Sequence, residues 1–334
     1  MITAEAVEKS ATKIVPAGSI MVGIRVGVGK VAINSVPMCT SQDIISIIGI
    51  DEGRWNKEYI SLALQYKAPI LASQAQGATI TGITSKTLKS IAIPVLPLAA
   101  QNAIVSQLRS IEQQIACMTV MLSQLDSLVK SRFIEMFGDP VTAEAKRELR
   151  AIGNFADVQT GATPLRRESK YYGGSIPWVK TGEVARKFAN GVEESITEVA
   201  IKETNCKVFP AGTVLVAMYG QGDTRGKAAI LPFEAATNQA CAAIMPSLAH
   251  NEVFLNVQLQ LLYEDMRAKS LGGNQKNLSL GIVKSMKVIL PPMEAQHEFA
   301  SFAAQVDKSR FVAQQQIEKL QMLYDSLAQE YFGD

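Results

Sequence analysis

The longest regular pattern in the chain is a row of apolar residues between positions 99 and 137. Its members alternate in steps of four and three residues, which is the spacing of the a and d positions of a coiled coil, and no Pro or Gly interrupts the stretch. The row consists of Ile104, Leu108, Ile111, Ile115, Met118, Leu122, Leu125 and Val129. An amphipathic helix packed on its own domain is the alternative, but such helices rarely pass about 25 residues without a break. We therefore predict a helix of roughly 35 residues, about 50 Å long.

A second row with the same phase follows about 195 residues later and is less apolar. It consists of Phe299, Ala303, Val306, Arg310, Ala313, Ile317, Leu320 and Tyr324. Pro97 and Pro292 precede the two rows, at the end of a helix where a missing N–H is tolerated. We predict that the two helices pair antiparallel and hold two globular blocks at a fixed separation.

The rest of the chain also repeats, with an offset between 194 and 197 residues. The matched pairs include Pro16-Ala17-Gly18 with Pro210-Ala211-Gly212, Gly29-Lys30 with Gly226-Lys227, Thr40-Ser41-Gln42 with Thr237-Asn238-Gln239, and Phe137-Gly138-Asp139 with Phe332-Gly333-Asp334. An ordered duplication predicts a molecule with two similar faces, which suits a ligand that offers two sites.

Residues 146–291 form the more complete block, in which short β-rich runs are cut by Gly and Pro. The strand-like runs are Val208-Phe209, Val214–Met218, Ala228–Leu231, Ala240–Met245 and Val283–Leu290, and Asn251–Leu271 has a helical pattern. The mixture predicts an α+β fold with a pseudo-two-fold internal repeat. We expect a partial first globular domain at 1–98, a spacer helix at 99–139, a second globular domain at 140–291 and a C-terminal helix at 292–334.

Composition excludes several classes of protein. The four cysteines lack CxxC spacing and the chain has only two histidines, so we expect reduced thiols and no metal centre. No apolar run is long enough to cross a bilayer. The net charge of +2 divides into +3 for 1–98, −1 for 99–139, +4 for 140–291 and −4 for 292–334. Weakly positive globular blocks suit a polyanionic partner.

Two Gly-containing loops, Tyr219–Lys227 and Gly272–Asn277, combine flexible backbone with amide and cationic side chains, which suit base edges and phosphates. Solvated surface loops are the alternative. Our candidates for DNA contact are Lys180, Thr181, Tyr219, Gln221, Thr224, Arg225, Lys227, Asn274, Gln275 and Asn277, with Arg25, Lys30 and Gln76 in the first copy.

Motifs for catalysis fail on inspection. The segment that ends in Gly29-Lys30 lacks the first Gly of a phosphate loop, and Val31 stands where Ser or Thr would hold magnesium. No adenine-methyltransferase motif and no nucleophile elbow occurs. We predict that the chain has no catalytic residues.

The order of these motifs resembles the DNA specificity subunit of type I restriction–modification systems, over essentially the whole chain. The resemblance is carried by Gly174–Val184, Phe209–Leu215, Thr237–Cys241, Leu290–Gln296 and the helix that ends in Phe332-Gly333-Asp334. In that family each target-recognition domain contacts one half of a bipartite DNA site, and the two long helices set the gap between the halves.

The resemblance also implies partners. The helices would dock two methyltransferase subunits, two restriction and translocase subunits would join them, and S-adenosylmethionine, ATP and magnesium would be bound by those partners in the cytoplasm. The first copy has no counterpart of the stretch from Arg147 to Ser195, so we expect a first recognition domain without its front. A scaffold or decoy that binds methyltransferase subunits without contacting DNA, and a stand-alone nuclease or methyltransferase, are the rival hypotheses.

Overall fold

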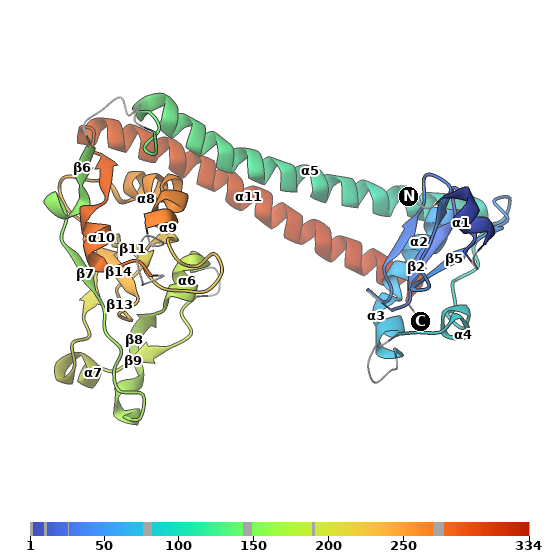
Figure 1. The fold of residues 1–334 in the computed structure, drawn as a ribbon, viewed down its shortest axis with the longest axis horizontal. Helices are drawn as coiled ribbons and strands as arrows, with labels where there is room; N and C mark the ends of the chain where they lie inside the picture. Colours follow the sequence, from blue (N-terminus) through green and yellow to red (C-terminus); the bar gives the residue numbers. More distant parts are fainter. Residues whose placement is uncertain are drawn as a thin grey trace. The chain divides into compact units, whose positions relative to one another are not determined.

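The structure is a computed structural model that describes residues 3–9, 12–25, 27–75, 82–142, 149–188, 191–269 and 277–333. The chain forms two compact units (Figure 1). Unit 1 comprises Met1–Leu122 and Val312–Asp334, and unit 2 comprises Ser123–Phe311. Two long helices each contribute one part to each unit, so each unit is described with its own part of both helices.

The long helices are α5 (Leu98–Phe137) and α11 (Met293–Phe332), each of 40 residues, slightly longer than predicted. They begin directly after Pro97 and Pro292, as the sequence predicted. In unit 1 they run antiparallel, because Tyr331 and Tyr324 of α11 donate to Gln107 and Glu112 of α5 at 2.9 and 3.0 Å.

The same antiparallel pairing holds in unit 2. Arg310 of α11 pairs with Asp126 of α5 at 3.1 Å, and Arg132 pairs with Glu298 at 3.3 Å. The seam predicted from heptad spacing is confirmed, since its positions are buried or half-buried while the residues between them are largely exposed. Arg310, the charged residue on the seam, is accommodated because Asp126 and Asp307 neutralise it.

Unit 2 contains two four-stranded sheets and a set of short helices (Figure 1). Its elements are β6 (Leu149–Ala151), η1 (Ile152–Asn154), β7 (Val158–Thr160), η2 (Ser169–Tyr171), β8 (Tyr172–Val179), α6 (Thr181–Ala185), β9 (Ser195–Ile196), α7 (Glu198–Glu203), β10 (Val208–Phe209), β11 (Val214–Ala217), β12 (Ala228–Ile230), β13 (Ala235–Thr237), β14 (Cys241–Ile244), α8 (Glu252–Leu261), α9 (Tyr263–Lys269), α10 (Leu280–Ser285) and β15 (Lys287–Ile289).

The central sheet of unit 2, in the order β12-β11-β14-β7, is buried on both faces. One face packs against α8, η1 and α10, with Val214, Val216 and Ile244 in that core. The other face packs against the second sheet, in the order β10-β13-β8-β9, and against α6. Burial on both faces explains why these strands appear in the sequence as continuous apolar runs without alternation.

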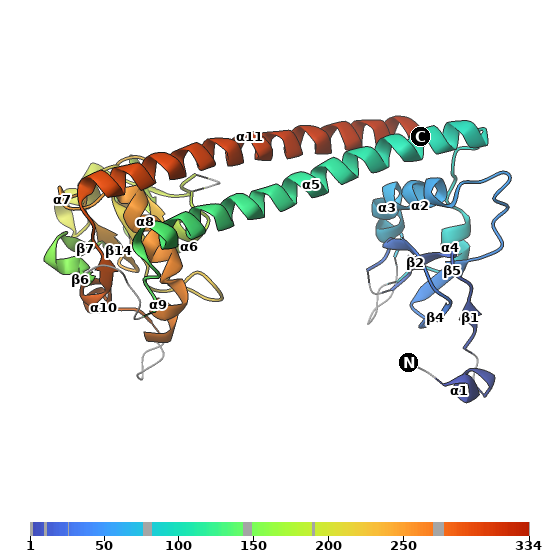
Figure 2. The ribbon, with the colours of Figure 1, turned by 90° about the horizontal axis from the view of Figure 1, so that it is seen from above.

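Unit 1 repeats part of this arrangement. Its elements besides the long helices are α1 (Ala4–Glu8), β1 (Ile14–Val15), β2 (Ile20–Gly23), β3 (Val31–Ile33), β4 (Met38–Cys39), β5 (Ile44–Ile47), α2 (Lys57–Tyr66), α3 (Ala68–Ser73) and α4 (Ser85–Lys89). The sheet order β3-β2-β5 corresponds to β12-β11-β14, and the pair β1-β4 corresponds to β10-β13. Figure 2 shows α2 and α3 on one side of this sheet, where Leu64 and Leu71 pack against Ile20 and Val22.

One buried glutamine at the start of each long helix fixes how the helix joins its domain. Gln101 accepts from the backbone N–H of Asn56 at 2.9 Å and donates to two carbonyls. Gln296 does the same with Asn251, which caps α8 as Asn56 caps α2. In the sequence, Pro97 and Gln101 recur as Pro292 and Gln296. In both copies the glutamine at this position binds the backbone of the residue that caps the helix packed beside it.

Each long helix ends with a phenylalanine that packs on the other copy of the repeat. Phe137 of α5 contacts Phe254 and Phe299 in unit 2, with ring centroids 5.0 and 5.9 Å away. Phe332 of α11 contacts Tyr59 in unit 1 at 5.3 Å. The end of the long helix from one copy of the repeat thus packs in the core of the other copy, so neither copy forms its core from its own residues alone.

One sequence prediction within unit 2 was wrong in part. In the predicted strand Val283–Leu290, residues 283–285 end the helix α10, which Ser279 caps, and only Lys287–Ile289 forms a strand. The helical pattern that begins at Asn251 is confirmed in the described residues as two helices, α8 and α9, with Leu262 between them. The other short apolar runs are strands, as predicted.

Candidate nucleic-acid interface

The loop between β11 and β12 is held in place by two side chains of α9. Tyr263 donates its hydroxyl to the carbonyl of Asp223 at 2.7 Å. Arg267 donates to the carbonyl of Gly222 at 3.0 Å and lies 5.3 Å from the Tyr263 ring centroid. The ammonium of Lys227 lies 4.7 Å from the same ring and 3.6 Å from Asp223. The loop is therefore a supported surface with cations around one aromatic ring.

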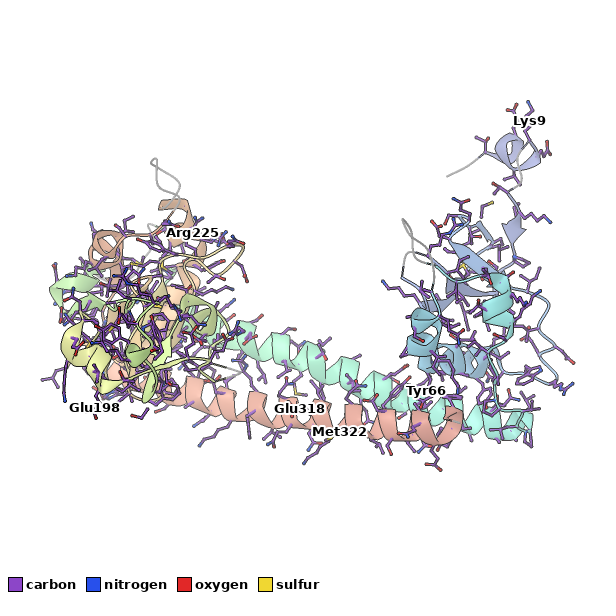
Figure 3. The ribbon with its side chains drawn as sticks, turned by 90° about the horizontal axis from the view of Figure 1, so that it is seen from below. Lys9, Tyr66, Glu198, Arg225, Glu318 and Met322 are labelled. Carbon is purple, nitrogen blue, oxygen red and sulfur yellow. The ribbon has the colours of Figure 1, made fainter. Side chains whose placement is uncertain are left out.

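The polar side chains of this loop differ in exposure. Tyr219 and Gln221 are exposed, whereas Thr224, Arg225 and Lys227 are half-buried. Arg225 lies on this loop in unit 2 (Figure 3). The exposed Tyr and Gln carry the groups that can contact a base edge, and the cations suit phosphate oxygens.

A second segment reaches the same end of strand β11. The backbone N–H of Leu278 donates to the carbonyl of Met218 at 3.1 Å. This bond brings the exposed Asn277 close to Tyr219, the residue that follows Met218. The structure thus gathers candidates from two segments about 55 residues apart in sequence.

The corresponding loop of unit 1 has the same backbone hydrogen bonds in a shorter form. Gly23 donates to the carbonyl of Lys30 at 2.8 Å, and Lys30 donates to that of Gly27 at 3.0 Å. Their counterparts are the bonds from Ala217 to Lys227 and from Lys227 to Thr224, at 2.9 and 3.1 Å. Lys30 is exposed, so the repeat presents one lysine at the same place in both units. Arg25, the other candidate described in unit 1, pairs with Asp43 at 3.3 Å.

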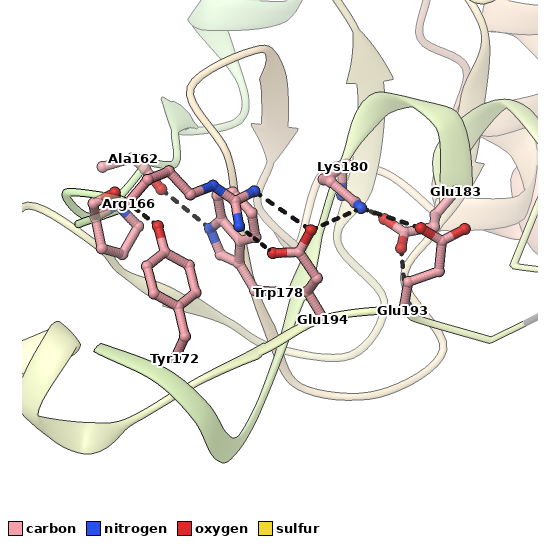
Figure 4. Close-up of polar contacts among 9 residues, drawn as sticks. Ala162, Arg166, Tyr172, Trp178, Lys180, Glu183, Glu193 and Glu194 are labelled. Carbon is pink, nitrogen blue, oxygen red and sulfur yellow. Dashed lines mark hydrogen bonds and ion pairs between the residues drawn. The ribbon is translucent and has the colours of Figure 1, made fainter. Parts of the chain in front are cut away.

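Lys180 lies in a different cluster, which Figure 4 shows. Its ammonium is 3.1 Å from Glu193 and 3.0 Å from Glu194, and the Glu194 carboxylate raises its pKa. Arg166 also binds Glu194 and stacks 4.9 Å from the ring centroids of Tyr172 and Trp178. Hydrogen bonds from Arg166 and Lys180 lower the pKa of Glu194.

The cluster around Lys180 is electrically balanced. Figure 4 shows two of its cations, Arg166 and Lys180, and its three carboxylates, Glu183, Glu193 and Glu194. The third cation, Arg186, pairs with Glu193 at 3.0 Å. Glu193 and Glu194 accept from two of the three N–H groups of the Lys180 ammonium, so a phosphate can use only the third N–H group or displace one of these carboxylates. The proposed contact of Lys180 and the half-buried Thr181 with DNA stays a prediction.

Sequence inspection missed the residues that support the loop. Tyr263 and Arg267 stand four residues apart on α9, so they share a helix face and a common orientation toward the loop. This spacing was visible in the sequence, but the loop that it faces was not. Gln76, Asn274 and Gln275 lie outside the described residues.

Within the described ranges, no three His, Cys, Asp or Glu side chains gather as a metal-binding group. Over the same residues, no helix combines the length and apolar character that a membrane span requires.

The family model "Type I restriction modification DNA specificity domain" matches residues 1–126 and 145–322. The chain belongs to this family. The matched residues of this specificity-domain protein lie in both copies of the repeat and therefore in both units.

A curated relative of this specificity-domain protein is the type I restriction enzyme MjaIX specificity subunit of Methanocaldococcus jannaschii. It is 22% identical over 342 residues, which span 98% of this chain and 79% of the relative. A crystal structure of the type I restriction–modification S subunit from M. genitalium shares the fold, with a TM-score of 0.62, 16% identity, and coverage of 96% of this chain and 85% of that one. A structure described under complex assembly and conformational transition of the type I R-M system gives a TM-score of 0.63 at 15% identity, over 96% and 83% of the two chains.

Proposed function

We propose that the chain is the non-catalytic specificity subunit of a type I restriction–modification complex and recognises a bipartite DNA site. The observation that carries this proposal is the repeated loop, which has the same backbone hydrogen bonds and ends in a lysine in both units. Membership of the specificity family and the name of the MjaIX relative support it. Each loop contacts one half-site, and the paired helices set the gap between the halves.

We assign the loop residues to two kinds of contact, those with base edges and those with phosphates. Tyr219, Gln221 and Asn277 are exposed and offer groups that can discriminate bases. Lys227 contacts phosphate, because its ammonium rests on the face of Tyr263 and can turn toward an external anion while it keeps that contact. In unit 1, Lys30 has the corresponding role.

The complex also includes methyltransferase subunits, which dock on the long helices, and restriction and translocase subunits. S-adenosylmethionine, ATP and magnesium are bound by those subunits, and this chain binds none of them. Large apolar side chains that stay exposed on the helices support docking: Val120, Met121, Leu128, Phe311, Met322 and Leu323. Exposed apolar residues in such number on paired helices favour a protein partner.

The test is genome-wide mapping of methylated adenines in cells that carry this gene with a methyltransferase subunit. Once the motif is known, binding is measured on that duplex. Gln221→Ala should cost about 1–3 kcal/mol and relax the preference at one position. Lys227→Ala should weaken binding to all sequences and reduce the salt dependence by about one ion.

Lys202→Ala is the matched control, because Lys202 pairs with Glu198 four residues away at 3.8 Å, as Lys227 pairs with Asp223. If Lys227→Ala behaves like Lys202→Ala, the loop does not contact DNA. If the chain co-purifies with the methyltransferase subunit but no motif and no duplex binding appear, it is the scaffold or decoy.

A further inference from the structure

A turn before one strand of the repeated sheet is built in the same way in both units. It is Thr237-Asn238-Gln239 between β13 and β14 in unit 2, and Thr40-Ser41-Gln42 between β4 and β5 in unit 1. The side-chain oxygen of Asn238 accepts from the backbone N–H two residues on at 3.1 Å, and that of Ser41 does the same at 3.3 Å. The middle residue therefore closes the turn, and the glutamine that follows has no part in closing it.

In unit 2 this glutamine lies beside the strand end from which the loop between β11 and β12 begins. The backbone N–H of Met218 donates to the carbonyl of Ala240 at 2.8 Å, in continuation of the antiparallel pairing of β11 with β14. Tyr219 follows Met218 and Gln239 precedes Ala240, so the two residues are neighbours at the same edge of the sheet. Gln239 thus lies next to a residue that we assign to base contact.

Unit 1 has the equivalent arrangement. The backbone N–H of Ile24 donates to the carbonyl of Asp43, also at 2.8 Å, in continuation of the pairing of β2 with β5. Arg25 follows Ile24 and Gln42 precedes Asp43, so these two residues are neighbours in the same way. The repeat thus places a glutamine at the same point of both units, whereas its neighbour differs.

Both glutamine side chains can donate to a ligand. Gln239 and Gln42 are exposed. The N–H of Ala162 donates to the carbonyl of Thr237 at 3.0 Å, which brings Thr163 beside the turn of unit 2. The Thr163 hydroxyl donates to Oε1 of Gln239, so the Nε2 amide group is the part of this side chain that stays available. Within the described part of unit 1, no hydrogen bond to another residue occupies the side chain of Gln42.

Comparison of the two copies separates contacts that both half-sites share from contacts that distinguish them. Two half-sites have the sugar–phosphate backbone in common, whatever their base sequences. A side chain that recurs at the same point of both units therefore suits the backbone, and one that differs, as Tyr219 and Arg25 do, suits the bases. An amide that can only donate also matches a phosphate oxygen, which can only accept.

We propose that Gln42 and Gln239 each donate to a backbone phosphate, at equivalent places of the two half-sites, and so fix the position of each unit on the duplex. This inference rests on the proposed function and adds to it one contact in each unit that carries no base preference. Lys30 and Lys227 are the charged contacts to phosphate, and the glutamines are neutral ones. A neutral amide releases no counterion, so the affinity that it contributes is independent of salt.

The test measures binding of the full chain, together with its methyltransferase subunit, to the duplex that methylation mapping identifies. Gln239→Met and Gln42→Met remove the donor at exposed positions, and each should weaken binding about tenfold. The factor should be the same for duplexes with one base pair changed, and the salt dependence should equal that of the unaltered chain. When the phosphates are replaced one at a time by methylphosphonates, one position should make Gln239→Met and the unaltered chain bind equally.

Gln305→Met is the matched control, since Gln305 is an exposed glutamine on α11 in the same unit as Gln239. It should bind like the unaltered chain. Equal affinities for Gln239→Met and Gln305→Met would overturn the inference, and so would a changed preference at one base pair, because Gln239 would then contact a base. Both outcomes leave the proposed function standing. If the unaltered chain in the same complex binds no duplex with sequence preference, the proposed function is wrong and this inference is wrong with it.

Discussion

The buried glutamine at the start of α11 gives the sharpest test of how the recognition domain is fixed to its helix. Gln296 is 0% exposed and makes three hydrogen bonds, to the N–H of Asn251 at 2.8 Å and to the carbonyls of Ala249 and Pro291 at 3.1 and 2.8 Å. Gln296→Met conserves volume and helix propensity but removes all three. A buried polar group without a partner costs about 1–3 kcal/mol. After a small shift the two carbonyls can accept from water, so we expect Gln296→Met to lower the free energy of unfolding by about 3 kcal/mol in total.

The two tryptophans provide unit-specific probes for this experiment. Trp178 is buried in unit 2 and Trp55 lies in unit 1, so each can be isolated by changing the other to Phe. With a urea dependence of about 3 kcal/mol per molar, Gln296→Met should lower the midpoint reported by Trp178 by about 1 M. Gln305→Met, at an exposed position of the same helix, is the control. Equal midpoints for Gln296→Met and Gln305→Met would refute the argument that these bonds hold the joint.

Three further outcomes follow from burial in the two units. Phe332→Ala should lower the free energy of unfolding by about 3–5 kcal/mol, because the ring is 1% exposed among the aromatic residues of α2, while Phe311→Ala, at 64% exposure, should change it by less than about 0.5 kcal/mol. Burial raises the pKa of the Cys241 thiol, so at pH 8 the exposed Cys117 should react with a thiol reagent at once and Cys241 only at the rate of unfolding; comparable rates would contradict the buried strand. Burial, followed by a carboxylate of α5, raises the pKa of Tyr324 from the ordinary value of 10.0 to about 12. The contribution of Tyr324 to stability is then complete below pH 10 and is lost as the pH rises to about 12. In Tyr324→Phe the unfolding midpoint should therefore fall less steeply with pH over this window than in the unaltered chain.

The local elements were predictable because they depend on the spacing of apolar residues and on the positions of Pro and Gly. The heptad row fixed α5, since only a helix places residues at steps of four and three on one face, and Pro97 and Pro292 marked where the long helices begin. The Gly-containing loop that ends at Lys227 was also predicted, and Gly226 in this loop has a φ of 88°, which suits glycine. The end of the domain was mispredicted at Val283, where an apolar run has no periodicity that separates a strand from one turn of helix.

The candidate site was predictable only as a set of residue types. Tyr219 and Asn277 lie together because a hydrogen bond between Leu278 and Met218 joins two distant segments, and no local signal encodes that bond. Lys180 carries the positive charge that the sequence assigned to DNA contact, yet folding brings Glu193 and Glu194 to it. The division of the cations into those neutralised within the fold and those that face outward is thus a tertiary property.

The sequence by itself determined that the chain is a duplication built on two long helices, because repeats and heptads survive in the order of residues. Only the tertiary structure decided how the copies interlock, with Phe137 and Phe332 each completing the core of the other copy. It also decided how deeply equivalent strands are buried, since Cys241 of β14 is 0% exposed in unit 2 whereas Ile44 of β5 is half-buried in unit 1. The physical reason is that burial depends on contacts between residues far apart in the chain, and spacing along one segment does not record what packs against it.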